Sequence, residues 1–147
     1  SCMVGEPRKT YLGERWFPLV LQNVHRYFLY LAVVFIFLLA WDAYKAFWFA
    51  DGFGIGLGTL VLCVNVTLLG SYTFGCHSWR HLIGGRKDCF SCGGDGQISM
   101  AHGVWKKSSW LNARHMNFAW ISLFWVTLTD VYISLLSMGI IRHLNTW

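Results

Sequence analysis

Charged residues are scarce in this sequence of 147 residues, in which only 13% are Asp, Glu, Lys or Arg while 55% are hydrophobic and 18% aromatic. Soluble domains carry about 25% charged residues, so this balance excludes an ordinary soluble domain. The mean hydropathy is +0.43, and the apolar residues are gathered into runs. Composition and distribution together predict an integral membrane protein with a single domain.

The first twenty residues lack an apolar stretch. They are polar and basic and contain Pro7 and Pro18, so we expect no cleavable secretory signal there. A disulfide framework is also missing, because the five cysteines are odd in number and show no such pattern. An extracellular module held by disulfides is therefore disfavoured, and metal ligation or free thiols remain as roles for the cysteines. We expect Cys2 and Cys63 to be structural.

Three long apolar runs are present, and each exceeds the roughly 20 residues that cross a hydrocarbon core of ~30 Å. Residues 27–48 carry charge only near their far end, residues 53–76 carry none, and residues 116–141 are charged only at Asp130. The predicted fold class is all-α, a membrane bundle of three transmembrane helices with a basic cytoplasmic loop. Residues 1–24 would be a cytoplasmic N-terminal segment and residues 25–147 the transmembrane anchor domain.

Lysine and arginine are distributed unevenly around these runs. Ten of the twelve lie before the first run or between the second and the third. The positive-inside tendency places that side, and with it the N-terminus, in the cytoplasm. Because this orientation explains the net charge of +5, we expect no nucleic-acid partner.

Soft metal ligands are concentrated at the cytoplasmic end of the second run. The six candidates are Cys76, His77, His81, Cys89, Cys92 and His115. The first two histidines are four residues apart, so they share one face if the helix continues by a turn before Gly84 and Gly85 end it. The two later cysteines form a CxxC pair, whose spacing lets two thiolates reach one metal ion.

Two kinds of metal centre suit these sulfur and nitrogen ligands. Zinc with four protein ligands would form a closed structural clasp. A 2Fe–2S centre with two thiolates on one iron and two imidazoles on the other would be a Rieske-like redox site. The structural alternative is that the histidines bond to lipid headgroups or helix ends and the cysteines pack as small apolar side chains. We expect no haem held by this chain alone, because none of the three runs has a central histidine.

A quinone site is a further candidate at the same membrane face. A quinone needs donors for its carbonyl oxygens and apolar walls for its ring. The candidate residues are His25, Arg26, Ser78, Arg80 and Trp110. The alternative for the first two is that they extend to lipid headgroups.

Asp130 is the one charged residue in the third run. Such a side chain costs at least ~2.5 kcal/mol in a membrane unless it faces a partner or water. One interpretation is a buried carboxyl that bonds to Asn65, Thr67 or a neighbouring subunit, and the other is a proton path.

The most specific motifs are CHSxRHxxGG at residues 76–85 and LNxRHM at residues 111–116. Together with the first run, NVHRYFLYLAVVFIFLLAWDAYKAF, they resemble the membrane subunit of actinobacterial-type succinate dehydrogenase, a succinate:quinone oxidoreductase. The similarity covers nearly the whole chain from about Asn23 onward.

This resemblance implies a non-catalytic anchor in the bacterial inner membrane. Flavoprotein and iron–sulfur subunits would oxidise succinate in the cytoplasm, and the anchor would pass their electrons to menaquinone or a related quinone. The resemblance also implies that a Rieske-type cluster replaces haem, although soluble Rieske domains space their ligands differently. The favoured ligands are Cys76, His81, one of Cys89 and Cys92, and one of His77 and His115. Whether a second membrane subunit completes the bundle stays open, and the alternative function is a zinc-clasped membrane scaffold without redox activity.

Overall fold

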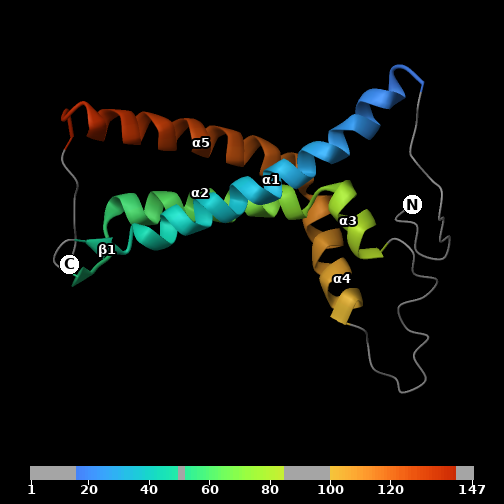
Figure 1. Ribbon diagram of the computed structural model, residues 1–147, viewed down its shortest axis with the longest axis horizontal. Coiled ribbons are helices and arrows are strands. Elements are labelled where there is room, and N and C mark those ends of the chain that lie inside the picture. Colours follow the sequence, from blue (N-terminus) through green and yellow to red (C-terminus); the bar gives the residue numbers. More distant parts are fainter. Residues whose placement is uncertain (1–15, 50–51, 85–99, 142–147) are drawn as a thin grey trace. The chain divides into compact units, whose positions relative to one another are not determined.

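The computed structural model describes residues 16–49, 52–84 and 100–141. Within these ranges the chain forms five helices and one two-stranded hairpin (Figure 1). The helices are α1 (Leu19–Lys45), α2 (Leu57–Phe74), α3 (His77–Gly84), α4 (Met100–Ala113) and α5 (His115–Ser137), and the strands are β1 (Trp48–Phe49) and β2 (Gly52–Phe53). The predicted helical membrane fold is confirmed.

Three helices are long and apolar enough to cross a membrane, and they correspond to the three predicted spans. They are Asn23–Lys45 within α1, Leu57–Phe74 and His115–Ser137. The predicted boundaries differ in two places. α1 already begins at Leu19, because residues 19–26 are helical although they precede the predicted apolar run. α2 is shorter than residues 53–76, because Phe53 belongs to β2 and the chain turns after Phe74.

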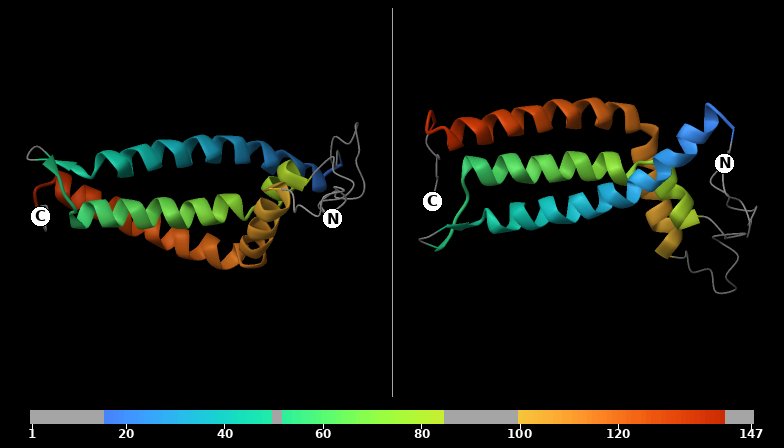
Figure 2. Two further views of the ribbon diagram at one scale, coloured as in Figure 1. Left: turned by 90° about the horizontal axis from the view of Figure 1, so that it is seen from below. Right: turned by 45° about the horizontal axis from the view of Figure 1, so that its top comes forward.

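The chain divides into two compact units. The junction unit comprises Ser1–Ala32 and Thr73–His115, and the span unit comprises Val33–Tyr72 and Met116–Trp147. The predicted basic loop between the second and third spans is partly helical, because it contains α3 and α4. These two helices pack against each other within the junction unit (Figure 2).

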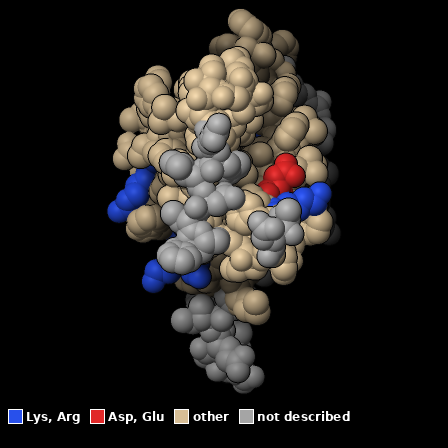
Figure 3. Space-filling model, turned by 90° about the vertical axis from the view of Figure 1, so that its left-hand side faces the viewer, with Lys and Arg blue, Asp and Glu red and all other residues tan. Residues whose placement is uncertain are grey.

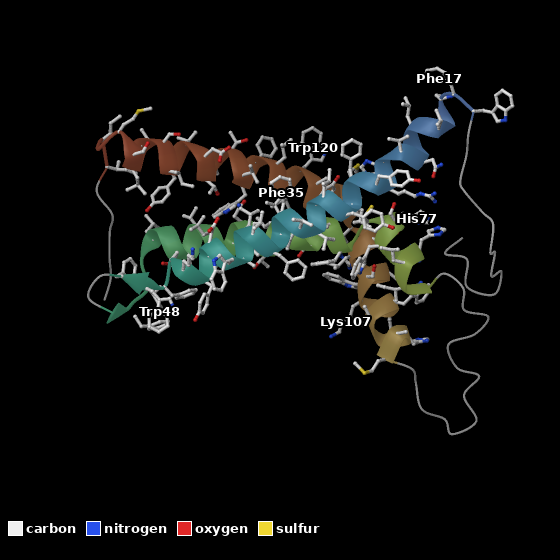
Figure 4. All side chains as sticks on the ribbon, viewed as in Figure 1. Phe17, Phe35, Trp48, His77, Lys107 and Trp120 are labelled. Carbon is white, nitrogen blue, oxygen red and sulfur yellow. The ribbon has the colours of Figure 1, made fainter. Side chains whose placement is uncertain are left out.

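Small polar side chains are buried in the span unit, and large apolar ones are exposed. Asn65 on α2 and Ser122 and Thr129 on α5 are at most 5% exposed, whereas Trp120 is 57% exposed (Figure 4). This distribution is expected of membrane helices, which approach each other through small residues and turn large apolar side chains toward lipid. The buried hydroxyls bond within their own helix, as Thr129 Oγ1 does by donating to Trp125 O at 2.8 Å.

Hydrogen bonds to backbone carbonyls hold α2 in place within the span unit. The indole Nε1 of Trp125 on α5 donates to Val61 O on α2 at 3.2 Å. Thr59, which is 2% exposed, donates from Oγ1 to Ala46 O at 2.6 Å and so ties the start of α2 to the residue after α1. Both acceptors are backbone carbonyls, so the contacts fix helix positions without pairing two side chains.

An aromatic hairpin joins α1 to α2. In it Trp48 pairs with Phe53 and Phe49 with Gly52, whose φ of 122° favours glycine. The Phe47 and Phe53 rings stack at 5.7 Å, and the Trp48 ring meets Phe53 edge-on at 5.8 Å. The face seen from the β1 side carries few charged side chains (Figure 3). These features are typical of the aromatic belt of a membrane protein.

Candidate functional site

Three of the candidate ligands, Cys76, His77 and His81, lie in or just after the turn between α2 and α3. Cys76 N donates to Thr73 O at 3.2 Å, which turns the chain at Gly75. α3 then begins at His77, and Arg80 N donates to Cys76 O at 3.2 Å. The two histidines therefore lie in a helix of their own, α3, which a turn separates from the second span. α3 ends at Gly84, one of the two glycines expected to stop the helix.

His77 and His81 meet on one face of α3, as their spacing predicts. Their Nε2 atoms are 2.8 Å apart, and the ring centroids are 4.4 Å apart at an interplanar angle of 73°. At this separation one Nε2 carries a proton and donates it to the lone pair of the other. The two Nε2 atoms therefore face each other across this contact.

Partial burial of the imidazole lowers the pKa of His77, and the nearby charges of His81 and Arg80 lower the pKa further. The side chain as a whole stays exposed, and its ring projects away from α3 (Figure 4). A lowered pKa favours the neutral imidazole, which is the form that binds metal ions. His77 is thus suited to ligation near neutral pH.

The histidine pair fits two positions of a metal centre. With metal–nitrogen bonds of ~2.05 Å, nitrogens 2.8 Å apart subtend an angle of roughly 86° at the ion. Reaching the tetrahedral angle requires only ~0.5 Å more separation, which small side-chain rotations supply. The distance between the two Nε2 atoms is therefore close to that of two ligands on one metal ion.

The other predicted ligands do not complete this group within the described residues. Cys76 is only 9% exposed, and His115 is half-buried as the first residue of α5. In the described ranges, no three His, Cys, Asp or Glu side chains are grouped so that they could hold a metal ion. Cys89 and Cys92 lie outside those ranges, so the six-ligand set stays a prediction.

Two side chains of α4 bond to the carbonyl groups that end α2. Ser108 Oγ donates to Phe74 O at 2.9 Å, and Asn112 Nδ2 donates to Gly75 O at 2.8 Å. They lie on the same face of α4 because they are four residues apart. Carbonyls at a helix end lack partners within the helix, so these bonds satisfy groups that would otherwise be unpaired.

Arg80 completes this contact from α3. Its Nη1 donates to Asn112 Oδ1 at 2.8 Å, and its guanidinium lies 5.4 Å from the centre of the Trp105 ring. We call Arg80, Trp105, Ser108 and Asn112 the junction clasp. Asn112 uses both ends of its amide, one on the turn and one on α3, so the clasp fixes the backbone beside the candidate ligands. Arg80 Nε is buried and has no hydrogen-bond partner among the described residues.

The remaining predicted quinone residues all lie in the junction unit. His25 is exposed and Arg26 half-buried on α1, and Ser78 is half-buried on α3. Trp110 on α4 is 54% exposed, and the Arg114 guanidinium lies 4.2 Å from the centre of its ring. Their joint binding of a quinone stays a prediction.

Charge is divided between the two units. The described part of the junction unit has no acidic residue and five basic ones: Arg26, Arg80, Lys106, Lys107 and Arg114. The described part of the span unit has Lys45, Asp42 and Asp130. The described part of the junction unit is therefore basic, as expected of the basic loop that the sequence predicts.

Asp130 is exposed on α5, which corrects one interpretation of its role. A carboxyl buried within this chain and bonded to Asn65 or Thr67 is not found among the described contacts. The carboxylate is exposed, so a bond to a neighbouring subunit and a proton path both stay as predictions.

Comparisons with known proteins agree with these features. The family model described as actinobacterial succinate dehydrogenase subunit SdhC matches residues 1–139. The chain belongs to this SdhC family. A chain of the solved Mycobacterium smegmatis Sdh1 complex in the apo form is 45% identical to it, with a TM-score of 0.78. That match covers 97% of this chain and 52% of the solved one, so the SdhC-family chain spans about half the length of the relative. No curated protein matches in sequence.

Membership of the SdhC family confirms the resemblance given by the sequence motifs, and the three spans identify a membrane protein.

The structure adds residues that the sequence did not single out, namely Trp105, Ser108 and Asn112 of the junction clasp. Only the four-residue spacing of Ser108 and Asn112 hinted at a shared helical face, and α4 was not predicted as a helix.

Proposed function

We propose that this SdhC-family chain anchors a succinate dehydrogenase in the bacterial cytoplasmic membrane. It passes electrons from a soluble iron–sulfur subunit to a quinone through a metal centre at the turn between α2 and α3. The observation that carries the proposal is the distance of 2.8 Å between the Nε2 atoms of His77 and His81. His77 directly follows Cys76 in the sequence. Family membership and the three candidate spans support the anchoring role.

His77 and His81 would supply the two imidazole ligands of the centre, and Cys76 with one of Cys89 and Cys92 would supply the thiolates. When bound, a 2Fe–2S cluster with such mixed ligands supplies one-electron transfer at a potential above that of an all-cysteine cluster. The junction clasp supports the ligands by fixing the carbonyl of Gly75, one residue before Cys76. Hydrogen bonds to the ligands and to the backbone beside them fix the orientation of the ligands, which preserves the geometry of a metal site.

Arg80 is the side chain best placed to link the ligands with a quinone. It lies on α3 between the two histidines, and its buried Nε is a donor that no described residue uses. A quinone carbonyl oxygen requires such a donor, and the ring of Trp105 beneath the guanidinium supplies an apolar wall. The predicted partners His25, Arg26, Ser78 and Trp110 would line the rest of the site.

The basic surface of the junction unit would receive the soluble subunits. Five basic residues and no acidic one in its described part favour an acidic partner surface. In this proposal the N-terminus and α3 lie on the cytoplasmic side, where succinate oxidation would occur. The chain itself contributes no residue to succinate chemistry.

Electron paramagnetic resonance of the purified complex tests the proposal. A reduced Rieske-like centre gives a signal of low average g value, whereas zinc gives none. Cys76→Ser is expected to abolish the signal and quinone reduction while dye-linked succinate oxidation continues. Cys63→Ser is the matched control, since Cys63 lies on α2 in the span unit and outside the candidate ligand set.

Two outcomes would contradict the proposal. Zinc without any iron signal in the membrane part would favour the alternative of a zinc-clasped scaffold without redox activity. An unchanged signal in Cys76→Ser would remove Cys76 from the ligands and leave the histidine pair without its adjacent thiolate.

A further inference from the structure

Arg80 carries a positive charge that the described part of its unit does not neutralise. Two neutral groups hold the guanidinium: Asn112 Oδ1 accepts from Nη1 at 2.8 Å, and the centre of the Trp105 ring lies 5.4 Å away. The described part of the junction unit has no acidic residue, so it offers Arg80 no ion pair. Charges that leave water are normally paired with an opposite charge. A half-buried arginine among neutral partners therefore keeps a charge that can act on its surroundings.

This charge is fixed beside the candidate histidine ligands. Arg80 lies three residues after His77 and directly before His81 on α3, and at 3.6 residues per turn the three side chains leave the helix within an arc of about 100°. Partial burial of the imidazole and the charge of His81 lower the pKa of His77, and the charge of Arg80 lowers this pKa further. The field of Arg80 therefore reaches an imidazole that would bind the metal centre.

We propose that Arg80, as a fixed positive charge on α3, raises the reduction potential of the metal centre. This inference rests on the proposed 2Fe–2S centre and concerns how the chain sets its potential. Reduction adds one electron, which the soluble iron–sulfur subunit supplies. A nearby positive charge stabilises the more negative, reduced form, and net charge is one of the factors that set the potential of such clusters. Arg80 therefore favours entry of the electron from the soluble subunit.

The expected size of the effect follows from the distance between the charge and the metal. Side chains three residues apart on a helix have Cβ atoms about 5–6 Å apart, so the guanidinium and a metal bound to His77 lie roughly 10–12 Å apart. With an effective dielectric constant of ~20, a unit charge at that distance changes the ratio of reduced to oxidised centre on the order of tenfold. For a one-electron centre, tenfold corresponds to about 59 mV in midpoint potential.

Potentiometric titration of the purified complex, followed by electron paramagnetic resonance of the reduced centre, tests the proposal. Arg80→Met removes the charge from a side chain of similar length and should lower the midpoint potential by about 59 mV. Arg80→Lys keeps the charge and should change the ratio by twofold or less, about 18 mV. Lys107→Met is the matched control, because Lys107 is exposed on α4 and water and salt screen its charge. Its side chain projects from α4 on the side away from His77 (Figure 4).

Two variants of Asn112 separate the effect of charge from the structural role of the junction clasp. Asn112→Asp places a carboxylate where the amide oxygen accepts from Arg80 Nη1. It measures how strongly one unit of charge at this position acts on the centre, and the potential should again fall by about 59 mV. Asn112→Leu also loses the bond to Gly75 O but adds no charge, so a change of twofold or less is expected. These variants decide the question if Arg80→Met does not assemble.

The outcomes that would overturn this inference differ from those that would overturn the proposed function. A reduced-cluster signal with the same midpoint potential in the parent, Arg80→Met and Asn112→Asp would refute the role of Arg80 and leave the redox centre in place. A fall in Asn112→Leu as large as that in Asn112→Asp would also refute it, because the geometry of the clasp would then account for the change. A parent complex without any reduced-cluster signal would overturn the proposed function, and this inference with it.

Discussion

Replacing Asn112 by leucine removes two hydrogen bonds from the junction clasp at once. The bond from Arg80 Nη1 to Asn112 Oδ1 involves a charged donor and is worth about 1.5–3 kcal/mol, and the bond to Gly75 O about 0.5–1.5 kcal/mol. Arg80 is only half-buried, so water replaces part of the first bond. Leucine also forms helix more readily than asparagine by a few tenths of a kcal/mol. The expected net loss is about 2 kcal/mol.

Thermal unfolding of the detergent-solubilised protein, followed by circular dichroism, measures this loss. For a chain of this size, about 2 kcal/mol corresponds to a fall in Tm of about 4–8 °C. Asn117→Leu is the matched control, because Asn117 is an exposed residue at the start of α5 and makes none of the described hydrogen bonds. Its Tm should stay within about 1 °C of the parent.

A double-mutant cycle with Arg80→Met shows whether the two side chains act together. If Arg80 and Asn112 form one unit, the combined loss is smaller than the sum by about 1 kcal/mol or more. Equal Tm values for Asn112→Leu and Asn117→Leu would refute the clasp. Strict additivity in the cycle would show that the 2.8 Å contact contributes nothing to stability.

Two further predictions concern the spans and their direction. Trp125→Phe should destabilise the protein by about 1–2 kcal/mol, because it loses the bond to Val61 O and leaves space against α2, whereas Trp120→Phe on the exposed side should change unfolding little. With the predicted orientation, Phe53→Cys should react with a membrane-impermeant maleimide in intact cells and Lys107→Cys only after permeabilisation; the reverse pattern would contradict the positive-inside assignment.

The spans were predictable because lipid imposes a simple requirement on sequence. A stretch of about 20 apolar residues leaves few alternatives to a helix, so the three spans were found with errors only at their ends. The start of α1 was missed because Gln22 and Asn23 are compatible with a helix that continues into water. The early end of α2 depends on the turn at Gly75, which is fixed by side chains far away in sequence.

The candidate site was predictable only where it depends on local spacing. His77 and His81 lie side by side because residues four apart share one face of a helix. Any helix through these residues would bring them together. The partner of Gly75 is 37 residues away on α4, a helix of low hydropathy that carries no apolar run to reveal it. Long-range bonds of this kind follow from how helices pack, and a single sequence gives no direct signal of them.

The exposure of His77 bears on the choice between a redox centre and a zinc clasp. Both kinds of metal centre need ligands in fixed positions, so the junction clasp is compatible with a redox centre and with a zinc site. A structural zinc site is complete with four protein ligands and does not require that any of them be exposed. Electron entry from a soluble partner needs the centre near the surface, and it needs a surface on which that partner can dock. The junction unit combines an exposed histidine with five basic residues in its described part, and only the redox proposal uses both.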